Sequence, residues 1–324
     1  MTSATFDGNL GGLAGADADC QSLALGAGLS GTFKAWLSTS TVNASTRLGT
    51  ARGFVRRDGQ PFADTVSDIT TGKILNSIDI DETGANIGFT KVWTATATDG
   101  TVIPGFTCLD WTDSTSSNQG DLGFTSGGPF TWTEAFSGIA CSNAFQHLFC
   151  FDTSIVNPLT INPANGRIAF VTMGNFDTSS GISGADAECA SQASAAGIVG
   201  TFKALLSTSG ATAASRFNLA VGTAPFVRPD GIKIADAPAI ASGTTLGSGI
   251  WQHADGTYDS VNAWTGSSTP KVAGTLATTC DDWSNNASMA TAIPGDSSRS
   301  DAAWWNKSVI FSCNGGASIY CLQQ

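Results

Sequence analysis

The stretch GADADCQSLALGAGLSGTFKAWLSTS, from Gly15 to Ser40, determines how this chain is organised. It returns as GADAECASQASAAGIVGTFKALLSTS from Gly184 to Ser209, without a gap and 169 positions further along. Gly-Ala-Asp, the cysteine, Gly-Thr-Phe-Lys-Ala and Leu-Ser-Thr-Ser are identical in the two copies. Composition bias does not produce such agreement. The chain is therefore a tandem repeat of one unit, and its function has to be explained by what a single unit can do.

The length of the chain fits this repeat, because 324 residues suit two domains of about 150 residues each. A domain of that size can bury a core of its own. We predict a first domain over 1–153, a linker over 154–165 and a second domain over 166–324. The linker contains Pro158 and Pro163 and is expected to be semi-stiff. With 38 glycines and only 13% charged residues, the composition favours short strands, long loops and few surface helices.

The charge of the chain restricts its partners. The net charge is −11, and no run of basic residues is longer than Arg56–Arg57. Nucleic acids and heparin-like polyanions are therefore poor candidates, since their binding depends mainly on neutralising phosphate or sulfate groups. No stretch of about 18 apolar residues occurs, so we expect no membrane span.

Each repeat contains four cysteines, at Cys20, Cys108, Cys141 and Cys150 and at Cys189, Cys280, Cys313 and Cys321. A metal site would need close ligand pairs such as C-x-x-C, which are absent. Disulfides explain the even count in each unit and predict an oxidising compartment, outside the cell or on its surface. The sequence carries no recognisable signal peptide, and we expect that segment to have been removed or to lie upstream. The spacing alone allows three pairings in each domain.

Local patterns predict the main elements of each repeat. Apolar residues at i, i+4, i+7 and i+8 predict a helix over about Ala16–Ala27, and Phe33–Leu37 reads as a buried strand. Asp58–Gly59 marks a hairpin turn. Trp36 is replaced by Leu205 in the second copy, so this position is expected to fill a core rather than stack on a ligand.

The order of these motifs resembles the endostatin domain of the collagens, and is most similar to leptospiral endostatin-like surface proteins. The matching features are GAD-x-x-C, AGL-x-GTFKAWLS, the Asp-Gly hairpin, the Val92-Trp-Thr strand, C-x-D-W at Cys108–Trp111 and a close final cysteine pair. They cover nearly the whole of each repeat. The resemblance implies an α+β fold of two tandem C-type-lectin-like domains, each with two short helices, small antiparallel sheets and long loops.

The resemblance also implies nested disulfides, namely Cys20–Cys150, Cys108–Cys141, Cys189–Cys321 and Cys280–Cys313. The leptospiral proteins bind host proteins, but that is a property of particular surfaces, which this sequence does not show. Two properties of animal endostatin do not transfer to this sequence. Its heparin site uses an arginine surface whereas this chain is acidic, and its zinc site uses N-terminal histidines that this chain does not have.

Catalytic patterns are weak, and we expect no catalytic residue and no enzyme. Nucleophilic catalysis needs a base beside a serine or cysteine. The two histidines, His147 and His253, have no counterpart in the other repeat and are expected in loops or at the surface. Asp110 and Asp282 lie next to cysteines and are expected to hold loop N–H groups.

Ligand contacts are best sought at tryptophans beside polar loops, because many sugar sites place an indole next to acidic groups. The candidates are Trp111, Asp113, Trp283, Asn285 and Trp305. Trp305 is included because the second repeat has two adjacent tryptophans where the first has only Trp132.

Calcium is the only metal for which the sequence contains a candidate motif, and we expect no cofactor. Asp79 and Asp81 resemble the start of an EF-hand loop, but position twelve is Thr90 rather than glutamate. The Glu-Pro-Asn and Gln-Pro-Asp signatures of calcium-dependent lectins are absent. The pair is therefore only a weak calcium candidate, in the first domain alone.

The two repeats differ at their first strand. The second copy has an apolar segment, Arg167–Val171, directly before Thr172, which aligns with Thr2. In the C-type-lectin-like fold that strand pairs with the last strand, here near Leu148–Phe151. For the first copy, the strand is either upstream sequence or donated by another subunit, and the edge beside it would otherwise be left unpaired.

These observations favour a secreted or surface-displayed, non-catalytic recognition module of adhesin or lectin-like type, whose partner is a glycan or a protein. The first alternative is a structural subunit of an extracellular filament or surface assembly, in which the open edge of domain 1 serves for self-association. The second alternative is a glycan-active enzyme, with paired carboxylates beside a tryptophan. The ligand and the oligomeric state do not follow from the sequence.

Overall fold

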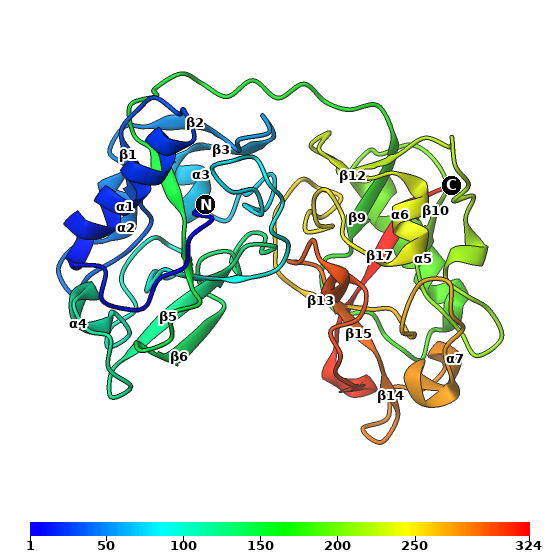
Figure 1. The fold of residues 1–324 in the computed structure, drawn as a ribbon. Helices are drawn as coiled ribbons and strands as arrows, with labels where there is room; N and C mark the ends of the chain where they lie inside the picture. Colours follow the sequence, from blue (N-terminus) through cyan, green and yellow to red (C-terminus); the bar gives the residue numbers. More distant parts are fainter. The chain divides into compact units, whose positions relative to one another are not determined.

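The computed structural model describes all 324 residues and shows a mixed α+β protein with few, mostly short helices and several small sheets (Figure 1). The chain divides into two compact units, Met1–Ile161 and Asn162–Gln324. This boundary lies inside the segment 154–165 that was expected to be the linker.

Unit 1 contains α1 (Gly12–Gly26), β1 (Phe33–Ala35), α2 (Ala44–Arg47), β2 (Arg52–Val55), β3 (Pro61–Thr65), α3 (Val66–Thr70), β4 (Lys91–Trp93), α4 (Cys108–Trp111), β5 (Gln119–Phe124), β6 (Phe136–Ala140), β7 (His147–Leu148) and β8 (Cys150–Asp152). Its strands form three separate sheets, with the orders β1-β8, β2-β3 and β6-β5-β4-β7.

Unit 2 contains β9 (Arg167–Val171), α5 (Gly181–Ala195), β10 (Phe202–Ala204), η1 (Ala214–Arg216), β11 (Phe226–Val227), β12 (Lys233–Ala235), α6 (Ala237–Ser242), β13 (Asn262–Trp264), η2 (Leu276–Thr278), α7 (Cys280–Trp283), β14 (Thr291–Ala292), β15 (Pro294–Asp296), η3 (Ala302–Trp304), β16 (Phe311–Ser312), η4 (Cys313–Gly315) and β17 (Ser318–Gln323). Seven strands form one sheet in the order β12-β11-β9-β17-β13-β15, with β10 also paired to β17. The remaining pair is β14-β16.

The repeated stretch builds a helix with a strand packed on it. Ala16, Cys20 and Ala24 form the buried face of α1, and small residues there let the strands approach closely. The shared Asp17 fixes the strand, because its carboxylate accepts a hydrogen bond from the Ala35 N–H at 2.9 Å and pairs with Arg47. In unit 2, Asp186 makes the same contacts with Ala204 and Arg216.

Four disulfides join the cysteines in nested order, Cys20–Cys150, Cys108–Cys141, Cys189–Cys321 and Cys280–Cys313, and no cysteine is free. Each outer bridge ties the first long helix to the last strand of its unit, across 130 residues in unit 1 and 132 in unit 2. Closing such a loop stabilises a domain by about 4–5 kcal/mol in the entropic account. Four such bonds indicate an oxidising environment.

The C-x-D-W motif forms a left-handed turn in both units. All four residues of Cys108–Trp111 have positive φ, between 48° and 66°, although none is glycine. This costs about 1 kcal/mol or more per residue, so the surroundings have to hold it. The Asp110 carboxylate accepts hydrogen bonds from the Ser40 N–H and Oγ at 2.7 and 2.6 Å, and Asp282 does the same for Ser209. The expected role of these aspartates, holding a loop, is confirmed.

Candidate functional site

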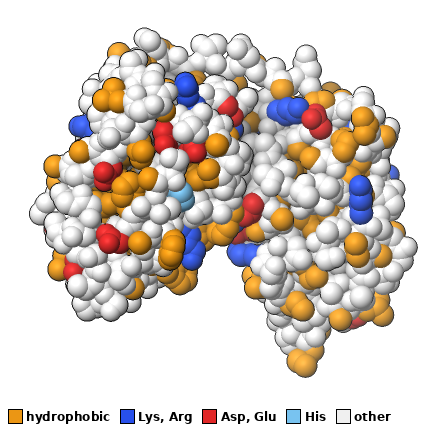
Figure 2. Space-filling model, in the orientation of Figure 1, with side chains coloured by type: hydrophobic (Ala, Val, Ile, Leu, Met, Phe, Trp, Pro, Cys, Tyr) orange, Lys and Arg blue, Asp and Glu red, His pale blue; other side chains and the backbone are white.

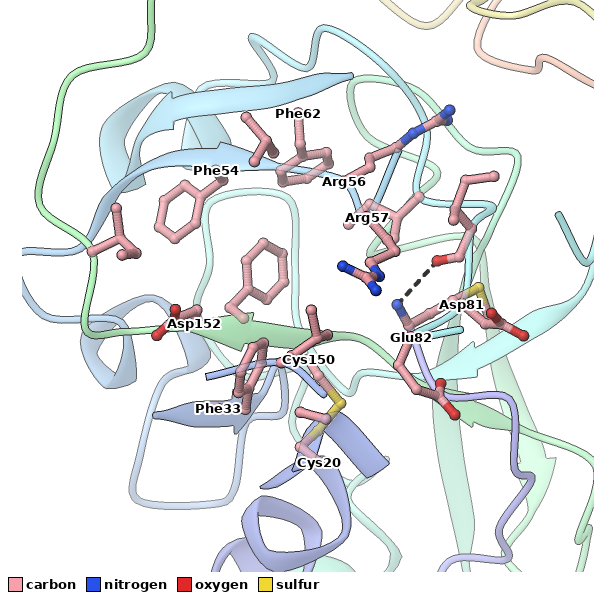
Figure 3. Close-up of a pocket in the computed structure, with 18 of the residues that line it drawn as sticks. Cys20, Phe33, Phe54, Arg56, Arg57, Phe62, Asp81, Glu82, Cys150 and Asp152 are labelled. Atoms are coloured by element: carbon pink, nitrogen blue, oxygen red, sulfur yellow. Dashed lines mark hydrogen bonds between the residues drawn. A yellow bond between two sulfur atoms is a disulfide. The ribbon is translucent and has the colours of Figure 1, made fainter. Parts of the chain in front are cut away.

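A cavity of about 430 Å³ opens in unit 1 between helix α1 and strands β2 and β8 (Figure 3). We call it the unit 1 groove. Phe33 and the Cys20–Cys150 disulfide lie on one side of it, and Phe54 and Phe62 lie on the other. Its lining is mainly apolar, so it can take up an apolar chain.

In unit 2 the corresponding place is filled by β9. This strand pairs antiparallel with β17, with Phe170 opposite Cys321, and parallel with β11, with Arg167 opposite Phe226. In unit 1, β8 pairs only with β1 and β2 pairs only with β3. The strand β9 therefore joins the β11-β12 hairpin to β17, and β17, which is continuous where unit 1 has β7 and β8, joins β10 to β13.

Burial of matched side chains confirms this difference between the units. Val55 is 56% exposed, whereas its counterpart Val227 is 2% exposed beneath β9. Phe33 is half-buried, whereas Phe202 is buried and contacts Phe170, with 5.5 Å between the ring centroids. Apolar side chains that are buried in the core of unit 2 are therefore partly exposed along the groove of unit 1.

One end of the unit 1 groove is set by Met1 and Thr2. The Thr2 N–H donates to the Leu148 carbonyl at 2.9 Å, and Thr172 makes the same bond to Ile319 in unit 2. The Met1 nitrogen donates to the Ile80 carbonyl at 3.3 Å, as the Val171 N–H does to Gln252. Met1 therefore occupies the position in unit 1 that Val171 occupies in unit 2. Beyond Met1, the groove follows the path that residues Phe170 to Arg167 of β9 take in unit 2.

Charged groups of both signs lie at the rim of the groove, among them Arg57. Arg56 contacts the carboxylates of Asp58 and Asp79 at 2.5 and 2.6 Å. Glu82 accepts hydrogen bonds from the N–H and Oγ of Ser3. The groove therefore offers apolar contact and strand edges rather than a strong field of one sign.

Both carboxylates of the weak calcium candidate, Asp79 and Asp81, already have partners within unit 1. Burial raises the pKa of Asp79, and its carboxylate is bound by Arg56 and by the Asn86 amide. Burial also opposes ionisation of Asp81, but hydrogen bonds from Thr83 and from the Ala85 N–H outweigh it and lower the pKa. No group of three or more histidine, cysteine, aspartate or glutamate side chains is placed to hold a metal ion.

Three of the predicted contact residues are also corrected. Trp111, Trp283 and Trp305 are fully buried, so their indoles form core rather than a binding surface. The left-handed turn aims the first two inward, where each indole N–H donates at 2.8 Å to a backbone carbonyl, that of Ser38 or Ser207. Trp305 packs edge-on against Trp304.

The other two predicted contact residues belong to surface turns. Asp113 accepts hydrogen bonds from the Thr115 hydroxyl and the Asn118 amide, which lower its pKa. Asn285 accepts from the Ala287 N–H and donates to Asp281. The structure does not bring either side chain to the unit 1 groove, and their contact with a ligand stays a prediction.

Neither histidine is at the surface, although His253 lies in a loop as expected, while His147 lies in β7. His147 and His253 are buried, and each Nδ1 lies within 2.9 Å of a backbone carbonyl, that of Thr2 or Val171. The two contacts are not equivalent, because Thr2 aligns with Thr172 and Val171 aligns with Met1. Both act in packing the segment that leads into the helix.

The groove residues themselves were not singled out from the sequence. A usable signal was present, because Leu23, Phe33 and Val55 are apolar and the first repeat has no segment matched to Arg167–Val171 to cover them. The sequence located one open edge, near Leu148–Phe151. It did not show that the edge of β2 faces the same cavity.

A second hollow, of about 310 Å³, lies in unit 2 and is lined mainly by polar residues such as Asn175, Asp177 and Asn314. On the face drawn in Figure 2, lysine and arginine side chains are scattered rather than gathered into a patch. No helix of the protein has the length and apolar character needed to cross a membrane.

Comparison of the sequence with known protein families found no matching family model. Comparison with curated proteins found no matching relative.

Proposed function

We propose that the chain is a pair of endostatin-like domains of the C-type-lectin-like fold that acts as a non-catalytic recognition module outside the cell or on its surface. The support is the ordered set of shared motifs, together with nested disulfides that suit an oxidising compartment. The partner is a protein or glycan ligand, as for an adhesin or lectin.

The observation that carries this proposal is the unit 1 groove. A mainly apolar cavity of about 430 Å³, bordered by β8 and β2, each of which pairs with a strand on one side only, is what a protein partner can fill. A glycan site would instead be expected to expose indoles for stacking, and all nine tryptophans are fully buried. The groove therefore favours a protein ligand over a glycan.

The test is a binding panel of immobilised extracellular proteins and glycans, probed with the full chain. We expect binding to at least one protein, and loss of that binding in Val55→Asp, which places a charge in the groove at an exposed position. The matched control is Val221→Asp, at an 89% exposed valine in unit 2. Absence of binding to every member of the panel would contradict the proposal.

A second function, as a structural subunit of an extracellular filament or surface assembly, is favoured by the same two strand edges. Unpaired edges template association with other chains. Light scattering over a range of protein concentrations separates the two, because a structural subunit forms larger particles as its concentration rises and a recognition module keeps one mass.

A further inference from the structure

We propose that the unit 1 groove binds an extended, apolar peptide strand, seated as β9 is seated in unit 2. The strand runs antiparallel to β8 and parallel to β2, and its last residue lies next to Met1. This inference rests on the proposed recognition function and names the partner class as a β-strand rather than a folded surface or a small apolar molecule.

The backbone geometry of unit 2 supplies the template. There, Phe170 and Ala169 lie opposite Cys321 and Leu322, while Arg167 and Ile168 lie opposite Phe226 and Val227. The matching edge residues of unit 1 are Cys150 and Phe151 on β8, and Phe54 and Val55 on β2. The Arg52 N–H at the start of β2 already donates to the Ile155 carbonyl at 3.1 Å. Because β8 and β2 each have a strand on one side only, a guest strand can hydrogen-bond to β8 and to the Phe54–Val55 end of β2 at once.

The side-chain pattern of β9 predicts which side chains the bound strand needs on each of its two faces. Phe170 points to the core beside helix α5, and Ala169 and Val171 point to the opposite core beside Trp304 and Tyr320. Both faces of the strand are therefore buried, as in a central strand. A guest of unit 1 needs bulky apolar residues toward α1 and smaller apolar residues toward the β2-β3 hairpin.

The walls of the groove match this requirement. Leu23 and Phe33 line the side of α1, and Phe54, Ile78 and Ile80 line the side of the hairpin. An apolar small molecule could cover these side chains, but it would leave the backbone groups of both strand edges without partners. A peptide strand satisfies both kinds of surface, which is why we infer a strand as the occupant.

The experiment uses the full chain and a labelled peptide with the sequence of residues 164–170, ANGRIAF, as a C-terminal amide. We expect saturable binding of one peptide per chain by fluorescence anisotropy. A peptide with aspartate in place of the residues corresponding to Ile168 and Phe170 is expected to bind at least about tenfold more weakly, since it would bury charge in apolar walls. Hydrogen–deuterium exchange should show protection of 150–152 and 54–55 when the first peptide is bound.

Two protein variants make the result specific to the groove. Val55→Asp should weaken peptide binding by about tenfold or more, and Val221→Asp should leave it unchanged, with circular dichroism confirming that both variants are folded. Equal binding of the peptide to Val55→Asp would overturn the proposal, because the peptide would then sit elsewhere.

Three further outcomes would also overturn it. They are no detectable peptide binding, uptake of an apolar probe such as decanoate by the groove without any competition from the peptide, and a dimer in which a folded face of a second copy, rather than an extended strand, already protects 150–152. A failed peptide experiment beside a positive protein panel would remove the strand as the partner class and leave the recognition function standing.

Discussion

At the scale of individual residues, two groups matter. Those of the first group hold strained backbone in place, and those of the second have a pKa that burial shifts. Asp110 belongs to the first group, because it bonds to Ser40 and so holds a turn in which four consecutive non-glycine residues have positive φ. Asp121 belongs to the second group. It is buried, and burial raises its pKa to about 7 despite hydrogen bonds from Ser137 and Thr94.

Replacing Asp110 by alanine should destabilise unit 1 by about 2–3 kcal/mol, since two charge-assisted hydrogen bonds to Ser40 are lost while the strained turn remains. Urea denaturation of the full chain measures this, with Asp113→Ala at a surface turn as the control, expected to change stability by less than about 0.5 kcal/mol. Equal effects of the two substitutions would show that Asp110 does not hold the turn.

Asp121 should make the stability of unit 1 depend on pH. Its pKa when folded, about 7, lies above the ordinary value of 3.8, so the unfolded chain loses this proton first. Stability should therefore fall as pH rises from about 4 to about 7, and then level off, with a ceiling of about 4 kcal/mol.

Asp121→Asn should remove most of that fall, because the amide carries no charge to bury. The matching position of unit 2 is Ile293, so this place in the fold does not need an acidic group. Denaturation midpoints between pH 4 and pH 9 test the prediction. A wild-type stability that rises over this range, with Asp121→Asn rising in parallel, would contradict it.

At the scale of elements, the two units differ by one strand. Unit 2 has β9 between β17 and β11, whereas the matching strands of unit 1, β8 and β2, border the groove. Equivalent side chains therefore lie in a core in one unit and in a cavity wall in the other, as Val227 and Val55 do.

Adding the sequence Arg-Ile-Ala-Phe of β9 directly before Met1 should place a strand in the groove and raise the melting temperature of unit 1 by about 5 °C. The reason is that Met1 already stands where Val171 stands, so the added residues continue along the line of the groove. Each kcal/mol gained in a domain of this size raises Tm by about 2–4 °C. Calorimetry measures it, with Arg-Asp-Ala-Asp as the control extension. Equal melting temperatures for the two extensions would exclude strand insertion.

At the scale of the whole molecule, the acidic charge and the missing metal cluster determine how binding should respond to solution conditions. The net charge is −11, and no three metal-ligating side chains meet. Binding to a confirmed protein partner should therefore persist in EDTA and in the presence of heparin. A binding titration with each additive tests this, and loss of binding that returns on adding calcium would refute it.

The two units should also differ in what they bind, because only unit 1 has the groove. Each unit carries its own pair of disulfides and its own core. Expressing residues 1–161 and 162–324 separately and assaying both with the same partner decides the matter. We expect binding by the first unit alone, and equal affinities would count against the claim.

The sequence by itself determined the features that are local or that occur twice. The aligned repeat predicted two units and the helix followed by a strand, because an apolar face with period 3.6 and a shared cysteine are visible in the residues. The resemblance implied the nested disulfides, and the role of Asp110 followed from its neighbour Cys108.

Only the tertiary structure decided which apolar residues became core and which became groove. Trp111, Trp283 and Trp305 looked like ligand contacts, but a left-handed turn and close packing bury them. Val55 and Val227 occupy matching hairpin strands, yet one is exposed and the other is buried. The physical reason is that burial depends on which strand lies beside a residue, and that neighbour comes from more than fifty positions away in the chain.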